Sequence, residues 1–228
     1  MNLYERLNQE TTEQRNYLLT SEIIRQGLAG DINTEQYVAF LTQAYHHVKH
    51  TVPLLMSTGA HLPQDKEWLR EAVAEYIEEE MGHQEWILND IAACGYDKEQ
   101  VRASTPELAT EIMVAFAYDS ISRISPLTFF GMVHVLEGTS IAMADQAASA
   151  IQQSLKLPDK AFSYLRSHGA LDIEHVKFFA DLMNRITDSD EQDLIVSSTK
   201  KFYLLYANIF RSLEGIQPAQ VTEIRHVI

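Results

Sequence analysis

Apolar residues recur every three or four positions along almost the whole chain, and this period restricts the possible folds more than any other feature. One clear example lies in residues 34–56, where the repeating positions are Tyr37, Phe40, Leu41, Ala44, Tyr45, Val48 and Val52. No segment alternates apolar and polar residues for long, as a half-buried strand would. Glycine (9) and proline (6) are also scarce. The sequence therefore predicts an all-α fold.

Turn-forming residues divide this pattern into about seven helices. Asn33 is a good N-cap, Pro106 and Pro126 suit first turns, and Gly169 marks a point where the sixth helix can break. The expected helices cover residues 3–28, 34–57, 65–93, 106–123, 126–155, 159–186 and 190–213. No connection is long enough to separate two domains. We therefore expect one domain over residues 1–228, with an irregular tail at 216–228.

The composition excludes several classes of protein. Lys and Arg total 18 against 32 Asp and Glu, a formal net charge of −14, which argues against a nucleic-acid or anionic-membrane partner. A single cysteine, Cys94, allows no intramolecular disulfide and no cysteine-ligated zinc or iron–sulfur centre. The N-terminus lacks an apolar signal core, and no apolar run approaches about 18 residues. We expect a cytoplasmic protein that binds neither nucleic acid nor membrane.

Ionisable residues occupy core positions on three of the expected helices. Each of the following stripes lies on one side of its helix: Leu69, Val73, Tyr76, Glu80, His83, Ile87 and Ile91; Phe130, His134, Glu137, Ile141, Ala144, Ala148 and Ile151; Leu165, His168, Asp172, His175, Phe179, Leu182 and Ile186. Burying an unpaired carboxylate costs several kcal/mol, so such groups pair with each other or bind a metal. Histidine and carboxylate without thiolate favour iron or manganese.

Two sequence spacings indicate which of these residues would bind a metal together. Glu80-x-x-His83 directs both side chains to one place, as in helical di-iron carboxylate proteins. The spacing His168-x3-Asp172-x2-His175 brings three ligands together within two turns. The predicted metal ligands are Glu80, His83, Glu137, His168, Asp172 and His175. Glu79 lies one turn before His83 and stays an alternative to Glu80, which we prefer because its stripe is more apolar.

Other ionisable residues have plainer interpretations. His134 on its own is typical of a core histidine that bonds to a backbone carbonyl. His46, His47 and His50 share a helix with Lys49 and Gln43, which favours a solvated face.

Three further residues lie near the predicted site or stand alone. Tyr76 and Trp86 could pack around a substrate or carry an electron, with core packing as the alternative. Cys94 has no base beside it in sequence, so a structural role is expected.

Several segments resemble a known superfamily. GLAGDINTEQYVAFLTQAYHHV resembles the second helix of TenA/PqqC proteins, which have the haem-oxygenase-like helical fold. EEEMGHQEWILNDI, HVLEGTS and HGALDIEH together resemble the haem-oxygenase-like di-iron oxidases. That branch includes CADD-type p-aminobenzoate synthases, an alkene-forming fatty-acid decarboxylase and several N-oxygenases. In helix number and order, the resemblance covers nearly the whole chain.

The resemblance implies a function and assigns roles within it. His83, Glu137 and the triplet His168, Asp172 and His175 match the family's ligands. The family's third-helix glutamate is the weakest match, because one family-like spacing falls on Tyr76. The implied activity is O2-dependent oxidation of a small organic metabolite at two iron ions, with manganese or another first-row metal as other occupants and with no haem. Glu137 and Tyr76 are the predicted catalytic residues, and we expect a homodimer.

Sister branches of the superfamily supply the alternative. TenA thiaminases need a cysteine nucleophile between later helices, whereas Cys94 ends the expected third helix. Haem oxygenases use a histidine in the first helix, and residues 1–30 contain none. PqqC-type enzymes use no metal, which would leave the histidine–aspartate triplet unexplained. A TenA/PqqC-like protein without redox activity, or a structural or regulatory metal protein, remains the competing prediction.

Overall fold

The structure, a computed structural model, describes residues 1–170 and 172–214. At residues 168–170 and 172–175 it describes only the helical backbone, so the side chains of three predicted ligands lie outside the described residues. The tail predicted at 216–228 also lies outside them. Within the described ranges the chain forms helices and turns without a strand, which confirms the all-α prediction.

Most of the expected helices are divided into shorter ones. The first half of the chain contains α1 (Leu3–Glu10), α2 (Thr12–Leu19), α3 (Glu22–Ala29), α4 (Thr34–Val48), α5 (Thr51–His61), α6 (Glu67–Glu80), α7 (His83–Ala93) and α8 (Lys98–Ala103). The second half contains α9 (Leu108–Asp119), α10 (Phe129–Leu155), α11 (Ser163–Ala170), α12 (Asp172–Asn184) and α13 (Ser189–Ser212). α11 continues through Gly169 to Ala170, and the break predicted near Gly169 stays a prediction because residue 171, between α11 and α12, lies outside the described residues.

Local capping decides where these helices begin and end. Asn33 is the N-cap of α4, as predicted, and forms a capping box: its side chain accepts from Gln36 N at 2.8 Å, and the Gln36 side chain accepts from Asn33 N at 2.9 Å. The expected helix 65–93 instead breaks after Glu80. Gly82 adopts φ +94°, a left-handed conformation that ends one helix and that glycine adopts without strain.

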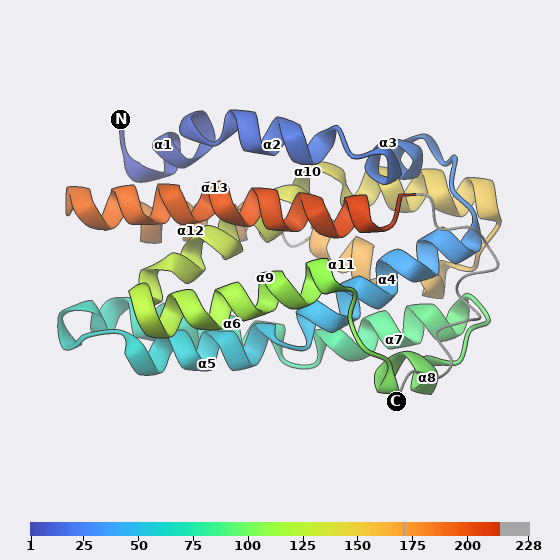
Figure 1. The fold of residues 1–228 in the computed structure, drawn as a ribbon, viewed down its shortest axis with the longest axis horizontal. Coiled ribbons are helices and arrows are strands. Elements are labelled where there is room, and N and C mark those ends of the chain that lie inside the picture. The colour runs from blue at the N-terminus through green and yellow to red at the C-terminus, as the bar shows by residue number, and fades with distance from the viewer. Residues whose placement is uncertain (171, 215–228) are drawn as a thin grey trace.

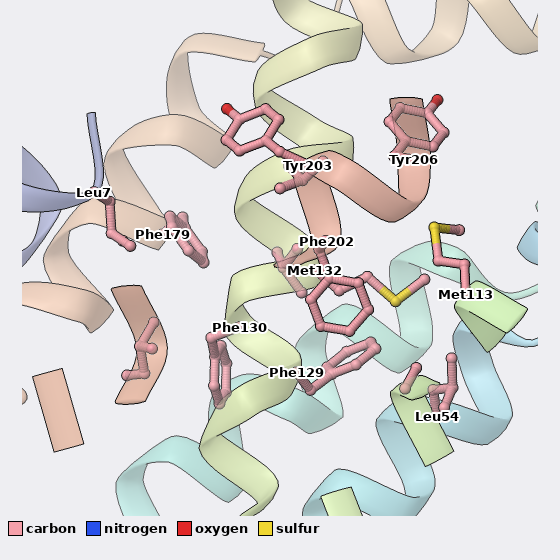
Figure 2. Packing of buried hydrophobic residues seen from close by; sticks show 14 of the residues in the cluster. Leu7, Leu54, Met113, Phe129, Phe130, Met132, Phe179, Phe202, Tyr203 and Tyr206 are labelled. Atoms are coloured by element: carbon pink, nitrogen blue, oxygen red, sulfur yellow. The ribbon is translucent and has the colours of Figure 1, made fainter. Parts of the chain in front are cut away.

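α10 is the central element of the bundle. It packs against α13, α11 and α3, while α13 also packs against α2 and α9 (Figure 1). The main apolar cluster lies where α10 meets α13. Figure 2 shows Phe129, Phe130 and Met132 of α10 gathered with Phe202, Tyr203 and Tyr206 of α13.

α10 and α13 approach each other most closely at Gly131. A Cβ atom on Gly131 would lie 2.7 Å from the backbone nitrogen of Thr199, which is closer than real Cβ contacts. The backbones of the two helices therefore touch there, and only glycine fits.

The stretch Pro126–Leu155, which includes α10, is long and apolar enough to span a membrane by length and composition. The expectation that no apolar segment approaches this length is therefore corrected. Buried core helices have the same composition, and most of the apolar 18-residue window within this stretch is buried inside the bundle.

Candidate metal centre

Glu80 and His83 meet across the break between α6 and α7. The Oε2 atom of Glu80 lies 3.0 Å from Nδ1 of His83, which is buried. The sequence placed both residues on one continuous helix, but they stand at the facing ends of two helices joined by Met81 and Gly82. The break nevertheless keeps the apolar stripe on one side, since Val73, Tyr76 and Ile87 are all buried.

Glu80 and Glu137 line the same cavity, which we call the carboxylate cavity. It has a volume of about 70 Å³ and lies between α4, α5, α6, α10, α11 and α13. Among the described residues, its polar lining consists of His47, Thr51, Tyr76, Glu80, Glu137, Ser140, Tyr164 and Tyr206. Glu79 is exposed and does not line this cavity, whereas Glu80 and Glu137 both do.

Tyr76 presents a buried hydroxyl at this cavity. The side chain is only 4% exposed, and within the described part of the chain its hydroxyl has no hydrogen-bond partner. Burial raises the pKa of this hydroxyl well above its ordinary value, and the negative charges of Glu137, Glu79 and Glu80 raise the pKa further. Burying a hydroxyl without a hydrogen-bond partner costs free energy. This indicates that the Tyr76 hydroxyl donates a hydrogen bond to a group outside the described side chains.

His47 also lines the carboxylate cavity, and sequence reasoning missed it. Its ring is 2% exposed and packs edge-on against Tyr206 with centroids 5.8 Å apart. The only signal in the sequence was the group of histidines on one helix, which was interpreted as a solvated face.

That interpretation was wrong for most of the group. His46 and Gln43 are also buried, because the start of α9 covers this side of α4. The Oε1 atom of Gln43 accepts from Glu107 N at 3.0 Å and from Thr110 Oγ1 at 2.7 Å. Burial first, and then the positive charge of Lys49, lowers the pKa of His46 to about 4, so this imidazole is neutral.

The other side chains discussed from the sequence take structural positions. His134 is 5% exposed among Tyr4, Phe179 and Tyr203, and burial lowers its pKa to about 4. Trp86 is partly exposed and stacks on the imidazole of His83, with ring centroids 4.0 Å apart.

Asp90, which sequence reasoning also missed, fixes the start of α11. This fully buried carboxylate on α7 accepts from Tyr164 N at 2.9 Å, from Ser163 N at 3.1 Å and from Ser163 Oγ. It therefore links the helix that begins with His83 to the helix that carries His168 in its backbone. No sequence pattern distinguished Asp90, because the groups that donate hydrogen bonds to its carboxylate are more than 70 residues away in the sequence.

The donor types at the carboxylate cavity suit iron, although the described side chains supply only part of a ligand set. Among residues whose side chains the structure describes, no three His, Cys, Asp or Glu groups form a metal-binding cluster. Those side chains exclude His168, Asp172 and His175. Two carboxylates at one buried cavity, with an imidazole 3.0 Å from one of them, match the oxygen and nitrogen donors of non-haem iron.

Comparison with solved structures defines the class of fold. The chain is similar to a domain of unknown function with a haem-oxygenase-like fold from Shewanella denitrificans, with 24% identity, coverage of 98% of both chains and a TM-score of 0.84. It is also similar to a TenA homologue from Pseudomonas syringae (12% identity; 93% and 92% covered; TM-score 0.78) and to haem oxygenase from Leptospira interrogans (19%; 93% and 100%; 0.75). These likenesses show a haem-oxygenase-like helical fold.

The family follows from a sequence match. Residues 38–207 match the model of a family described as iron-containing redox enzymes, and the chain belongs to that family. Among curated proteins no match was found. The matched range includes every predicted ligand and both residues predicted to be catalytic.

Proposed function

We propose that this protein is a non-haem di-iron oxidase that uses O2 to oxidise a small organic metabolite. Membership in the iron-containing redox family and the haem-oxygenase-like fold support the proposal. Glu80, His83 and Glu137 would hold the metal together with His168, Asp172 and His175. When bound, the irons would supply the site for O2 and the electrons that reduce it.

One observation carries the proposal: Glu80 and Glu137 reach the same cavity from different helices, and His83 contacts Glu80. Carboxylate oxygens and an imidazole nitrogen are the donors that non-haem iron accepts in proteins. Their position at one cavity therefore supports a metal between α6 and α10.

The protein's own groups have separate tasks in this proposal. Glu80 and Glu137 neutralise positive charge and fix its position between α6 and α10. The Tyr76 hydroxyl donates a hydrogen bond to a ligand in the cavity, and its raised pKa keeps the proton on the phenol oxygen. Leu55, Phe129, Met132 and Val133 form the apolar wall that excludes bulk water from the cavity.

The alternative thiamin-salvage hydrolase lacks support in the described side chains. Burial raises the pKa of the Cys94 thiol to about 11, which keeps it protonated and a poor nucleophile at neutral pH. Cys94 also follows α7 and does not line the carboxylate cavity.

The test is the iron content of protein produced in iron-supplemented medium, measured for matched variants. Glu80→Ala and Glu137→Ala should lose most of the iron, whereas Glu79→Ala, on the exposed neighbour, should keep the wild-type content. Reduced, iron-loaded wild type should consume O2 in an oxygen electrode. Wild-type iron content in the Glu80→Ala and Glu137→Ala proteins would refute the assignment.

The same preparations separate enzyme from structural metal protein and from haem protein. A structural site would bind iron and stay ferrous for hours in air. A haem protein would show a Soret band that titrates to one equivalent and disappears when a single histidine is replaced.

A further inference from the structure

A second cavity lies beside the carboxylate cavity, and we call it the apolar cavity. Its volume is about 90 Å³, and α3, α4, α10, α11 and α13 enclose it. Its walls are mainly hydrocarbon, including Ile24, Leu28, Phe40, Met143, Ile151 and Phe210. Among the described residues that line it, none carries a charge.

The two cavities adjoin each other. Ser140, Tyr164 and Tyr206 line both of them, from α10, α11 and α13 respectively. α10 runs along the two cavities in sequence. Its residues up to Ser140, including Glu137, face the carboxylate cavity, and those from Thr139 to Ile151 face the apolar cavity. From Glu137 to Ala147 the helix rises by roughly 15 Å, so the combined space is elongated.

The apolar cavity also has partly exposed residues at its edge. Leu28, Ile32, Gln36 and Phe40 are half-buried, so the cavity communicates with solvent on the side of α3 and α4. Two polar side chains of its lining bond to backbone groups. The Tyr37 hydroxyl donates to the carbonyl of Ala161 at 2.8 Å, and the Gln36 side chain accepts from Asn33 N at 2.9 Å.

We propose that the substrate has an apolar tail or ring that occupies the apolar cavity, and a polar end that faces Glu80 and Glu137. This inference rests on the proposed function and names the chemical class of its substrate. An apolar cavity of this size excludes ordered water and takes apolar molecules. Because it adjoins the carboxylate cavity through Ser140, Tyr164 and Tyr206, a molecule seated there extends toward the metal ligands.

Ala147 provides a way to block the apolar cavity alone. It lines that cavity and not the carboxylate cavity, so Ala147→Phe fills the space without touching a predicted ligand. The matched control is Ala142→Phe, which makes the same change at an exposed position on α10. Met143→Ala enlarges the cavity, and it keeps the test usable if Ala147→Phe fails to fold.

The first experiment uses metal-free protein and the neutral apolar fluorophore N-phenyl-1-naphthylamine. Wild type and Ala142→Phe should each bind about one equivalent with fluorescence enhancement. Ala147→Phe should bind at least tenfold more weakly. Equal affinity of the two phenylalanine variants would overturn the proposal, and this outcome does not depend on iron.

The second experiment uses iron-loaded, oxidised protein and n-alkyl hydroxamates of two to eight carbons, followed by their visible absorption on ferric iron. The dissociation constant should fall by about fourfold for each methylene that becomes buried. Ala147→Phe should remove this dependence while leaving the two-carbon member unchanged, and Met143→Ala should strengthen binding of the longest members. A protein that holds iron but shows no chain-length dependence would overturn the inference alone, whereas a protein that holds no iron would overturn the proposed function.

Discussion

Replacing Asp90 should destabilise the protein more than its position on a short helix suggests. Asp90→Ala removes the acceptor for two backbone N–H groups and for the Ser163 hydroxyl, at a carboxylate with no exposed surface. Each buried donor left without an acceptor costs about 1–3 kcal/mol. The carboxylate's own burial offsets part of this loss, so we expect a decrease of about 3–5 kcal/mol in the free energy of unfolding.

The assay is urea denaturation followed by circular dichroism, with Asp97→Ala as the control. Asp97 caps α8 from an exposed position and accepts from Glu99 N at 2.9 Å, so its loss should cost about 1 kcal/mol. Asp90→Asn, which keeps one acceptor oxygen, should fall between the two. The reasoning is refuted if Asp90→Ala and Asp97→Ala are equally stable.

The same carboxyl gives a pH dependence with a definite sign. Burial raises the pKa of Asp90 above its ordinary value of 3.8, although the hydrogen bonds from Ser163 and Tyr164 oppose this shift. The native state therefore holds this proton more tightly than the unfolded chain. The stability advantage of wild type over Asp90→Asn should be largest below pH 3.8 and should decrease as the pH rises through the raised value.

Three other changes test separate features. Gly131→Ala should lower the free energy of unfolding by about 3 kcal/mol or more, because the new Cβ meets the backbone of Thr199; an unchanged urea midpoint would contradict the close helix contact. Burial lowers the pKa of His134 from 6.5 to about 4, so the unfolded chain binds this proton at a higher pH than the native state does. As the pH falls from 6.5 to 4, the free energy of unfolding of wild type should therefore decrease by up to about 3 kcal/mol relative to that of His134→Leu. Parallel curves of stability against pH for the two proteins would contradict this. Gly82→Ala and Gly95→Ala should each cost about 1–2 kcal/mol, since both glycines have positive φ and open space around them. Only Gly82→Ala should also lower the iron content, and an equal loss in Gly95→Ala would contradict a local role for the α6–α7 break.

The sequence predicted the helical content and the core faces because both depend on local spacing. The start of α4 at Asn33 was equally local, since a capping box needs only residues three apart. The breaks inside the long expected helices were missed for the opposite reason. Gly82 in the sequence EMGHQ is compatible with a continuous helix, and its left-handed conformation became visible only in three dimensions.

In the candidate site too, the residues found from the sequence depend on local spacing, and the missed ones depend on contacts between distant segments. Glu80 and Glu137 were found because each stands on an apolar stripe where a carboxylate is unexpected. His47 was missed because its ring packs against Tyr206 of α13, which returns to α4 from a distant part of the chain. The adjacency of the two cavities could not be predicted either, since Ser140, Tyr164 and Tyr206 come from three helices.

The contact between α10 and α13 at Gly131 gives the bundle a mechanical pivot. Ser140 lies nine residues beyond Gly131 on α10, and Tyr206 lies seven residues beyond Thr199 on α13. A change of about 10° in the crossing angle would therefore move Ser140 by roughly 2 Å relative to α13, at the end of an arm of about 13 Å. Because both residues line both cavities, a small rotation at this glycine would change how far apart they stand where the two cavities adjoin.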